Sequence, residues 1–339
     1  MRMSNLDILS RDFWKDNRRF ADLFNTVLYD GKQVILPEKL MEADSNLSGS
    51  IQTKKKEDVF IERRADLIRK FAGDSEYAIF LLENQSHIHY GMPLRVMMYD
   101  ALGYREECAK KKRENKKNAV YANRDEFQSG MRKEERIHPV FTLVVYYGEK
   151  PWDGPRRLKD MMVDMPKWME KSFSDYSMNL LEIRSSEHAF QNEDVSRLVY
   201  MIQHIYRKQI EEMKKECADV YVKKDVIKLA GAITENEEII RYAEEHKEEE
   251  VLNMCEATKQ WEEKIRNDVI NMMGVRKEGE ENLAPEEAIE RLKTEGEAKG
   301  KAKGILEGRE NEKIEIAEKM KAEGFDNALI EKLTGILLH

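Results

Sequence analysis

Apolar positions in the first part of the chain switch between helical and strand-like spacing. Apolar residues three and four positions apart predict one amphipathic helix from Asp12 to Leu28. Two strand-like segments follow at residues 57–71 and 76–85, and the turn signal Ala72-Gly73-Asp74-Ser75 separates them. Residues 31–50 contain Pro37 and a polar run, which is typical of a loop with at most a short strand at Val34-Ile35-Leu36.

The pattern after residue 90 alternates again between helix and strand. Pro93 suits the first turn of a helix that we expect to run from about Leu94 to Lys117. A nearly continuous apolar run from Pro139 to Tyr147 is typical of a strand buried on both faces of a mixed sheet. A further strand is predicted at Tyr176–Ile183. The order of elements therefore predicts an α/β domain over residues 10–190.

The remainder of the chain is predicted to be almost entirely helical. Glu and Lys dominate from Glu193 onward, and apolar residues recur at helical spacing. A linker at residues 275–290 precedes glycines with a period of four, which indicate either a weak charged helix or a close helix–helix contact (Gly296, Gly300, Gly304 and Gly308). Two short helices should close the chain, the second capped by Asp326. Beyond the α/β domain we therefore expect three regions, at residues 191–274, 275–309 and 310–339.

Composition narrows the class of protein. The 339 residues carry a net charge of -8, so any nucleic-acid contact must be a local basic patch. The three cysteines are far apart without CxxC spacing, which disfavours a disulfide framework or a zinc site and fits a reducing cytoplasm. No run approaches the ~18 apolar residues of a membrane span. We expect a soluble cytoplasmic protein with no membrane partner.

Carboxylates interrupt two of the predicted strands. Asp66 lies within the segment IERRADLIRKF, and Glu83 ends the apolar run YAIFLL, with Gln85 two positions later. A charge inside a buried strand is costly unless it is paired or metal-bound. Mg²⁺ takes one or two carboxylates together with waters and phosphate oxygens, and it lowers the pKa of its water. The alternative is that these carboxylates face solvent on an edge strand or pair with a neighbouring arginine.

Longer segments around these residues resemble a known family. ERRADLIRKF, YAIFLLENQS, HYGMPLRVMMYDALGY and HPVFTLVVYYGEKPWDGPRRL are similar to the recombination-promoting nuclease (Rpn) and transposase family of the PD-(D/E)XK superfamily. The resemblance implies a mixed sheet flanked by helices and Mg²⁺-dependent cleavage of DNA. By position, Asp66 matches the motif aspartate and Glu83 its acidic partner, while Gln85 stands where the superfamily has a lysine. Ala65 replaces the proline of the motif.

The same resemblance suggests supporting residues on two helices. Arg95 and Tyr99 lie one helical turn apart, and related nucleases place a polar residue and a Tyr on this helix beside the active site. Superfamily members also place an acid on the first helix near the metal, which makes Asp22 a candidate metal ligand. The alternatives are an exposed Arg95, a Tyr99 packed in the core, and an ordinary surface charge at Asp22.

A dense basic run is the candidate DNA contact. It contains six cations within eight residues, close to the number of phosphate contacts that holds DNA with strong salt dependence (Lys110, Lys111, Lys112, Arg113, Lys116 and Lys117). Glutamates at positions 106, 107 and 114 weaken this patch, and a solvated helix end is the alternative. No base-reading motif is present, so no sequence specificity is predicted.

Three functions remain open from the sequence. The first is a Mg²⁺-dependent DNA endonuclease that acts in recombination or mobile-element transfer, with Asp66, Glu83, Gln85, Arg95 and Tyr99 as catalytic residues. The second is a non-catalytic DNA-binding or assembly protein on a decayed nuclease fold, because Gln85 cannot supply a lysine's charge. The third is self-association, as a homo-oligomer, through the helical C-terminal region.

Overall fold

The computed structural model describes residues 5–43, 46–52, 58–64, 66–72, 77–259, 261–263 and 306–337. The chain divides into two compact units, residues 1–196 and residues 197–339. None of the helices in these described ranges is long and apolar enough to cross a membrane.

The first unit is built on a five-stranded mixed sheet of order β1-β4-β5-β6-β7. Its strands are β1 (Leu40–Ala43), β4 (Leu67–Ala72), β5 (Tyr77–Gln85), β6 (Val140–Tyr146) and β7 (Asn179–Glu182). The pairs β1/β4 and β4/β5 are antiparallel, whereas β5/β6 and β6/β7 are parallel. A separate two-stranded ribbon pairs β2 (Asn46–Gln52) with β3 (Asp58–Arg64).

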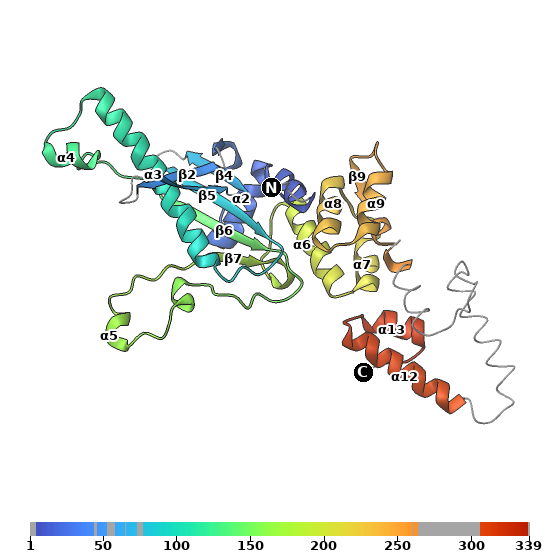
Figure 1. Ribbon diagram of the computed structural model, residues 1–339. Coiled ribbons are helices and arrows are strands. Elements are labelled where there is room, and N and C mark those ends of the chain that lie inside the picture. Colours follow the sequence, from blue (N-terminus) through green and yellow to red (C-terminus); the bar gives the residue numbers. More distant parts are fainter. Residues whose placement is uncertain are drawn as a thin grey trace. The chain divides into compact units, whose positions relative to one another are not determined.

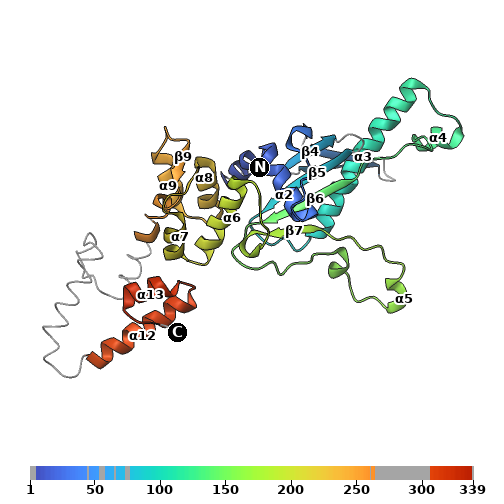
Figure 2. The same ribbon diagram turned by 180° about the vertical axis from the view of Figure 1, so that it is seen from behind.

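Helices cover both faces of this sheet (Figure 1). On one face, α3 (Met92–Asn118) packs its buried Tyr99 and Leu102 on Ile68, Leu81 and Val140. On the other face lies α2 (Asn17–Tyr29), seen from behind in Figure 2. Its Phe24 ring is 5.1 Å from the Phe80 ring, measured between centroids. Alternation along β5 sends Leu81 and Phe80 to opposite faces, so both faces are buried and the strand reads as a continuous apolar run.

Shorter elements complete the first unit. They are α1 (Asn5–Trp14), α4 (Arg124–Ser129), α5 (Lys167–Glu170) and the 3-10 turns η1 (Pro37–Lys39), η2 (Leu158–Met161) and η3 (Ile183–Ser185).

The second unit is mainly helical. Helix α6 (Glu193–Tyr206) enters it and is followed by α7 (Ile210–Cys217), β8 (Tyr221–Lys223), α8 (Lys224–Ile233), α9 (Glu237–Glu245) and β9 (Val251–Asn253). Helices α12 (Leu306–Ala322) and α13 (Asn327–Thr334) form a hairpin with its own apolar cluster of Ala317, Met320 and Ile330. Asp326 caps α13, as predicted, by accepting from the Leu329 N–H at 2.8 Å.

Two boundaries expected from the sequence are wrong. The single helix expected over residues 12–28 is two helices, because the Asp16 carboxylate accepts from the N–H groups of Arg18 and Arg19 and starts α2 there. The single strand expected over residues 57–71 is β3 followed by β4, with Asp66 in a bend between them. No strand forms at Val34-Ile35-Leu36, since the sheet's first strand begins at Leu40.

Other expected elements are present with small shifts. The helix expected at residues 94–117 is α3, and the strands expected at Pro139–Tyr147 and Tyr176–Ile183 are β6 and β7. The turn at residues 73–75, the linker at 275–290 and the glycines Gly296, Gly300 and Gly304 lie outside the described residues.

Candidate active site

Glu83 is the centre of a polar cluster at the carboxyl end of β5. Its side chain is only 2% exposed. Its Oε1 atom receives the Arg95 guanidinium at 2.5 Å, the Gln85 amide at 3.0 Å and the Tyr99 hydroxyl at 3.4 Å. Its Oε2 atom is also buried, yet no group of the described residues donates a hydrogen bond to it.

Helix α3 holds Arg95 and Tyr99 together over this carboxylate. The Arg95 Nε–H donates to the Tyr99 hydroxyl at 2.8 Å, as expected for side chains one helical turn apart. Burial and the nearby Glu83 charge raise the pKa of Tyr99 to about 12, so its phenol keeps its proton at neutral pH. The structure therefore brings Glu83, Gln85, Arg95 and Tyr99, four of the residues singled out from the sequence, into one cluster.

Asp66 is held at the same end of the sheet by a chain of hydrogen bonds. Its Oδ2 atom accepts from the Asn84 backbone N–H at 2.7 Å and from the Asn84 amide at 3.2 Å. The Asn84 amide oxygen accepts from the Tyr147 hydroxyl at 2.8 Å, which in turn accepts from the Trp14 indole N–H at 2.7 Å. Trp14 and Tyr147 are buried, so this series of hydrogen bonds links Asp66 to the hydrophobic core.

Both carboxyl groups have a raised pKa. Burial raises the pKa of Glu83 to about 8 and the Asp66 charge adds to that rise, whereas Arg95 and the Tyr99 hydrogen bond oppose it. Burial also raises the pKa of Asp66, although the Asn84 hydrogen bonds act in the opposite direction. Two carboxyl groups that repel each other's charge in a buried site are a common arrangement at functional sites.

The acidic residue expected on the first helix has two counterparts in the structure, Asp22 on α2 and Asp7 on α1. Asp22, on α2, is buried, and its Oδ1 atom accepts from the Gln191 backbone N–H at 3.0 Å. Its Oδ2 atom has no hydrogen-bond partner among the described residues. Asp7, on α1, is exposed and is the carboxylate whose charge adds to the rise in the pKa of Asp66. The metal-binding role of Asp22 stays a prediction.

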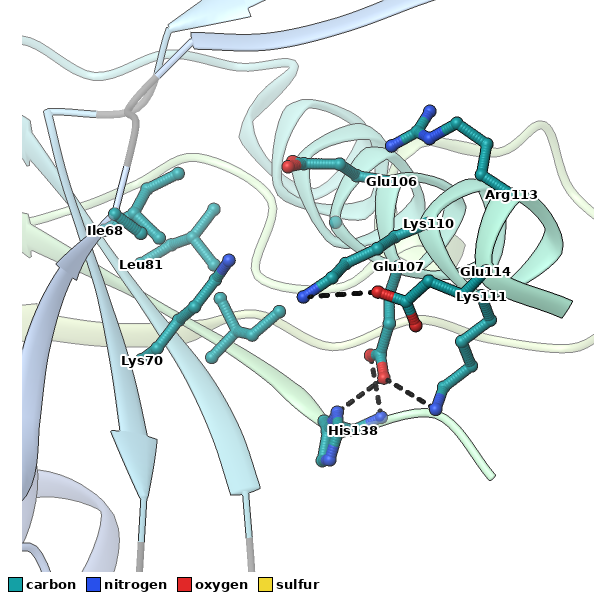
Figure 3. A pocket seen from close by; sticks show the side chains of 13 residues that line it. Ile68, Lys70, Leu81, Glu106, Glu107, Lys110, Lys111, Arg113, Glu114 and His138 are labelled. Carbon is teal, nitrogen blue, oxygen red and sulfur yellow. Dashed lines mark hydrogen bonds and ion pairs between the residues drawn. The ribbon is translucent and has the colours of Figure 1, made fainter. Parts of the chain in front are cut away.

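The basic run lies on the far half of α3, away from the carboxylates. Lys110, Lys111 and Arg113 line a pocket of about 210 Å³ between α3 and the sheet (Figure 3). Its floor is apolar, with Ile68 and Leu81, and Lys70 projects into it from β4 (Figure 3).

Glutamates neutralise part of this run. Lys110 pairs with Glu114 at 3.9 Å, and Lys111 pairs with Glu107 at 4.0 Å. The remaining cations of the run are exposed to solvent (Lys112, Arg113, Lys116 and Lys117). Their contact with DNA stays a prediction.

Comparison with known proteins identifies the family. The family model described as "Putative transposase, YhgA-like" matches residues 57–228, just over half of the chain. The chain belongs to this family. The family match contains both Asp66 and Glu83, in agreement with the resemblance seen in the sequence. No curated protein and no solved structure matches the chain.

The donor set of this transposase-family chain suits a hard divalent cation. Among the described residues, no three His, Cys, Asp or Glu side chains gather as a metal site, so a closed protein cage is not built here. Two carboxylates that disfavour each other's charge, one with an unused buried oxygen, match the one or two carboxylates that Mg²⁺ takes from a protein. Asp66 and Glu83 would be the residues that hold it.

Three residues of this site escaped the sequence reading. Asn84 is not among the candidates named from the sequence, yet its amide donates to Asp66. Tyr147 and Trp14 are 133 positions apart, and no periodicity in the sequence links them to each other or to Asp66. A polar residue between Glu83 and Gln85 was the only local signal that could have drawn attention to Asn84.

Proposed function

We propose that this transposase-family chain is a metal-dependent DNA endonuclease with a PD-(D/E)XK-type core. The observation that carries the proposal is Glu83, a buried carboxylate with an unused oxygen that lies close enough to Asp66 for the two charges to repel. Such an arrangement is costly for folding and is relieved when a cation binds. Its biological setting would be recombination or the transfer of a mobile element.

The residues divide the work of phosphodiester hydrolysis. A divalent cation held by Asp66 and Glu83 would supply a more acidic water and would stabilise the charge that builds on phosphorus. Tyr99 and Gln85 hold Glu83 in one rotamer through their contacts with Oε1, and Oε2 has no donor among the described residues. Arg95 is the cation placed to share its guanidinium between Glu83 and a substrate phosphate. The Asn84, Tyr147 and Trp14 chain fixes the orientation of Asp66.

The direct test is nicking of supercoiled plasmid by the full-length protein. Mg²⁺ should permit nicking, and EDTA should stop it. The Asp66→Asn and Glu83→Gln variants keep the size of each side chain but remove its charge, and both should be inactive. Nicking that persists in both variants would remove these carboxylates from the mechanism.

A second function has one specific observation in its favour. The Gln85 amide is neutral, and it donates to Glu83 and to the Asn84 carbonyl at 2.8 Å rather than standing free for a substrate. On this view the chain is a decayed nuclease that serves as a DNA-binding or assembly module. It predicts salt-sensitive binding to duplex DNA without a metal requirement and without nicking at any Mg²⁺ concentration.

A further inference from the structure

A pocket beside Asp66 opens on the side of the sheet that carries α1. It has a volume of about 190 Å³ and lies at the edge formed by β1 and β4. Its charged lining is cationic overall, with Arg11, Lys15 and Arg69 against Asp66 and Glu42. It is distinct from the pocket of Figure 3, which contains neither Asp66 nor any residue of α1.

Two of its three cations already have partners within the protein. Arg69 donates to the Asn17 side chain at 3.1 Å and to the carbonyls of Ile68 and Lys15 at 3.2 and 3.1 Å. Lys15, the residue after α1, pairs with Asp12 at 3.3 Å. The Arg69 contacts fix the sheet edge against the start of α2.

Arg11 is different. It is half-buried, and its Nε atom is fully buried without an acceptor among the described residues. Taking a guanidinium N–H out of water without a hydrogen bond costs about 1–3 kcal/mol, so folding gains nothing from this placement. The planar guanidinium is suited to bidentate contact with phosphate oxygens, and because Arg11 lines the pocket its charge would pair with an anion bound there.

The active site also needs a cation that its own motif does not supply. Gln85 is neutral where the superfamily has a lysine, and Arg95 is engaged with Glu83. Arg11 lines the same pocket as Asp66. A DNA strand bound at Asp66 would therefore have this arginine beside it.

We propose that Arg11 binds a backbone phosphate of the DNA strand next to the scissile phosphate. This inference rests on the proposed endonuclease function for its substrate, and it adds a binding subsite on α1 that the family match does not reach, because that match begins at residue 57. Arg11 is a substrate-binding residue in this assignment. Arg95 and Arg11 would then hold the strand from α3 and α1.

The test measures binding apart from cleavage. The full-length protein and its Arg11→Gln variant are titrated with a fluorescein-labelled DNA duplex in EDTA, over a range of salt concentrations, by fluorescence anisotropy. We expect the dissociation constant of the variant to rise about tenfold, because a charge-assisted hydrogen bond is lost. The slope of log affinity against log salt should fall by about one, which is the signature of one lost phosphate contact.

Arg18→Gln is the matched control. Arg18 is an exposed arginine of α2 outside this pocket, and its substitution should change neither affinity nor slope. Arg11→Lys keeps the charge but not the bidentate fork, so it should keep the slope and weaken binding a few-fold. If Arg11→Gln melts at a lower temperature than the wild type, the affinity and slope of Arg11→Lys serve as the test instead.

The outcomes separate this inference from the function on which it rests. Wild-type affinity and slope in Arg11→Gln overturn it, even if the protein nicks plasmid. Wild-type affinity in Arg11→Lys counts against the bidentate contact, and no duplex binding by the wild type overturns the whole proposal. If the wild type binds but never nicks, the endonuclease function fails, while a reduced slope in Arg11→Gln still supports the phosphate contact.

Discussion

Two buried carboxylates lie where α3 packs on the sheet, Glu83 on β5 and Asp100 on α3, and they differ in what surrounds them. Asp100 is 6% exposed, and both of its oxygens are used, one by the Thr142 hydroxyl at 2.5 Å and the other by the Tyr176 hydroxyl. Glu83 is 2% exposed, but only Oε1 has partners, and a second carboxylate acts on it. Burial raises the pKa of both groups.

This difference separates a structural carboxylate from a candidate functional one. Asp100 links α3 to β6 and to the segment before β7, so its burial is explained by the contacts that it makes. Glu83 bonds Arg95 and Tyr99 of α3 through Oε1, but its buried Oε2 has no donor among the described residues, which lowers stability. Burial alone therefore does not mark a site, whereas an unused oxygen and a like charge together do.

Removing the charge of Glu83 or of Asp100 should give the largest difference in nicking rate between the two sites. Glu83→Gln should lower the rate of Mg²⁺-dependent nicking by at least about 100-fold, because charge stabilisation at phosphorus is lost. Asp100→Asn should leave the rate per folded molecule within a few-fold of wild type while it lowers the free energy of unfolding by about 1–3 kcal/mol. Initial nicking rates and urea denaturation of the same preparations measure both effects. Equal activity losses in the two variants would erase the distinction.

The pH dependence of stability should distinguish the two sites next. Glu83 binds its proton more tightly in the folded protein, where its pKa is about 8, than in the unfolded chain, where it is near 4.5. Its contribution to stability is therefore complete below about pH 4.5 and is lost as the pH rises to about 8, at no more than about 1.4 kcal/mol per pH unit.

The Glu83→Gln variant should lack this decline when urea unfolding is measured in EDTA at several pH values. Asp66 and Asp100 remain in both proteins, so only the difference between the two profiles reports on Glu83. Mg²⁺ affinity of the wild type, measured by calorimetry, should rise over the same pH range because the cation competes with the proton. Parallel stability profiles for wild type and variant would rule out the raised pKa of Glu83.

The tyrosine hydroxyls that serve each site, Tyr147 near Asp66 and Tyr176 at Asp100, allow a second comparison. Tyr147→Phe removes the donor to Asn84, frees the amide that orients Asp66, and should lower kcat about tenfold with little change in KM. Tyr176→Phe removes the equivalent donor to Asp100 and should leave kcat unchanged. Both variants should lose about 1–3 kcal/mol of stability, since each leaves a buried acceptor without its donor. A kcat loss of the same size in Tyr176→Phe would mean that the effect is general loosening of the core.

The basic half of α3 should give the smallest effect. Lys116→Ala and Lys117→Ala remove exposed cations, so each should weaken DNA binding about two- to threefold and lower the salt slope by at most about one. Lys32→Ala, another exposed lysine of the first unit, serves as the control and should have no effect. Anisotropy titrations in EDTA measure all three, and unchanged slopes would make this part of α3 a solvated helix end.

Much of the fold follows from local patterns. Apolar periodicity places β5, α3 and β6 within a few residues of their observed bounds, because their burial is nearly continuous along the chain. The break between α1 and α2 and the bend at Asp66 were missed, since a capping aspartate and an interrupted strand look like ordinary polar positions in an apolar pattern. Asp66 matters most here, because the bend lets its carboxylate reach the Asn84 backbone.

The sequence by itself determined which side chains could do chemistry. Asp66, Glu83, Gln85, Arg95 and Tyr99 are readable because each is a polar residue at a definite position in a strand or helix pattern. Their family was also readable from the long segments around them. Glu83 and Gln85 are neighbours on one strand, and Arg95 and Tyr99 lie one helical turn apart, so short-range geometry already groups them in pairs.

Only the tertiary structure decided how each charge is satisfied. Whether a buried oxygen has a donor depends on residues far away in the chain, such as Trp14 and Tyr147 for Asp66 or Tyr176 for Asp100. The same holds for Arg11, whose buried Nε lacks an acceptor among the described residues only once α1 is packed against the sheet edge. Hydrogen bonding is short-ranged and directional. Spacing along the sequence therefore identifies the candidate polar residues, but it does not show which of them remain free for a ligand.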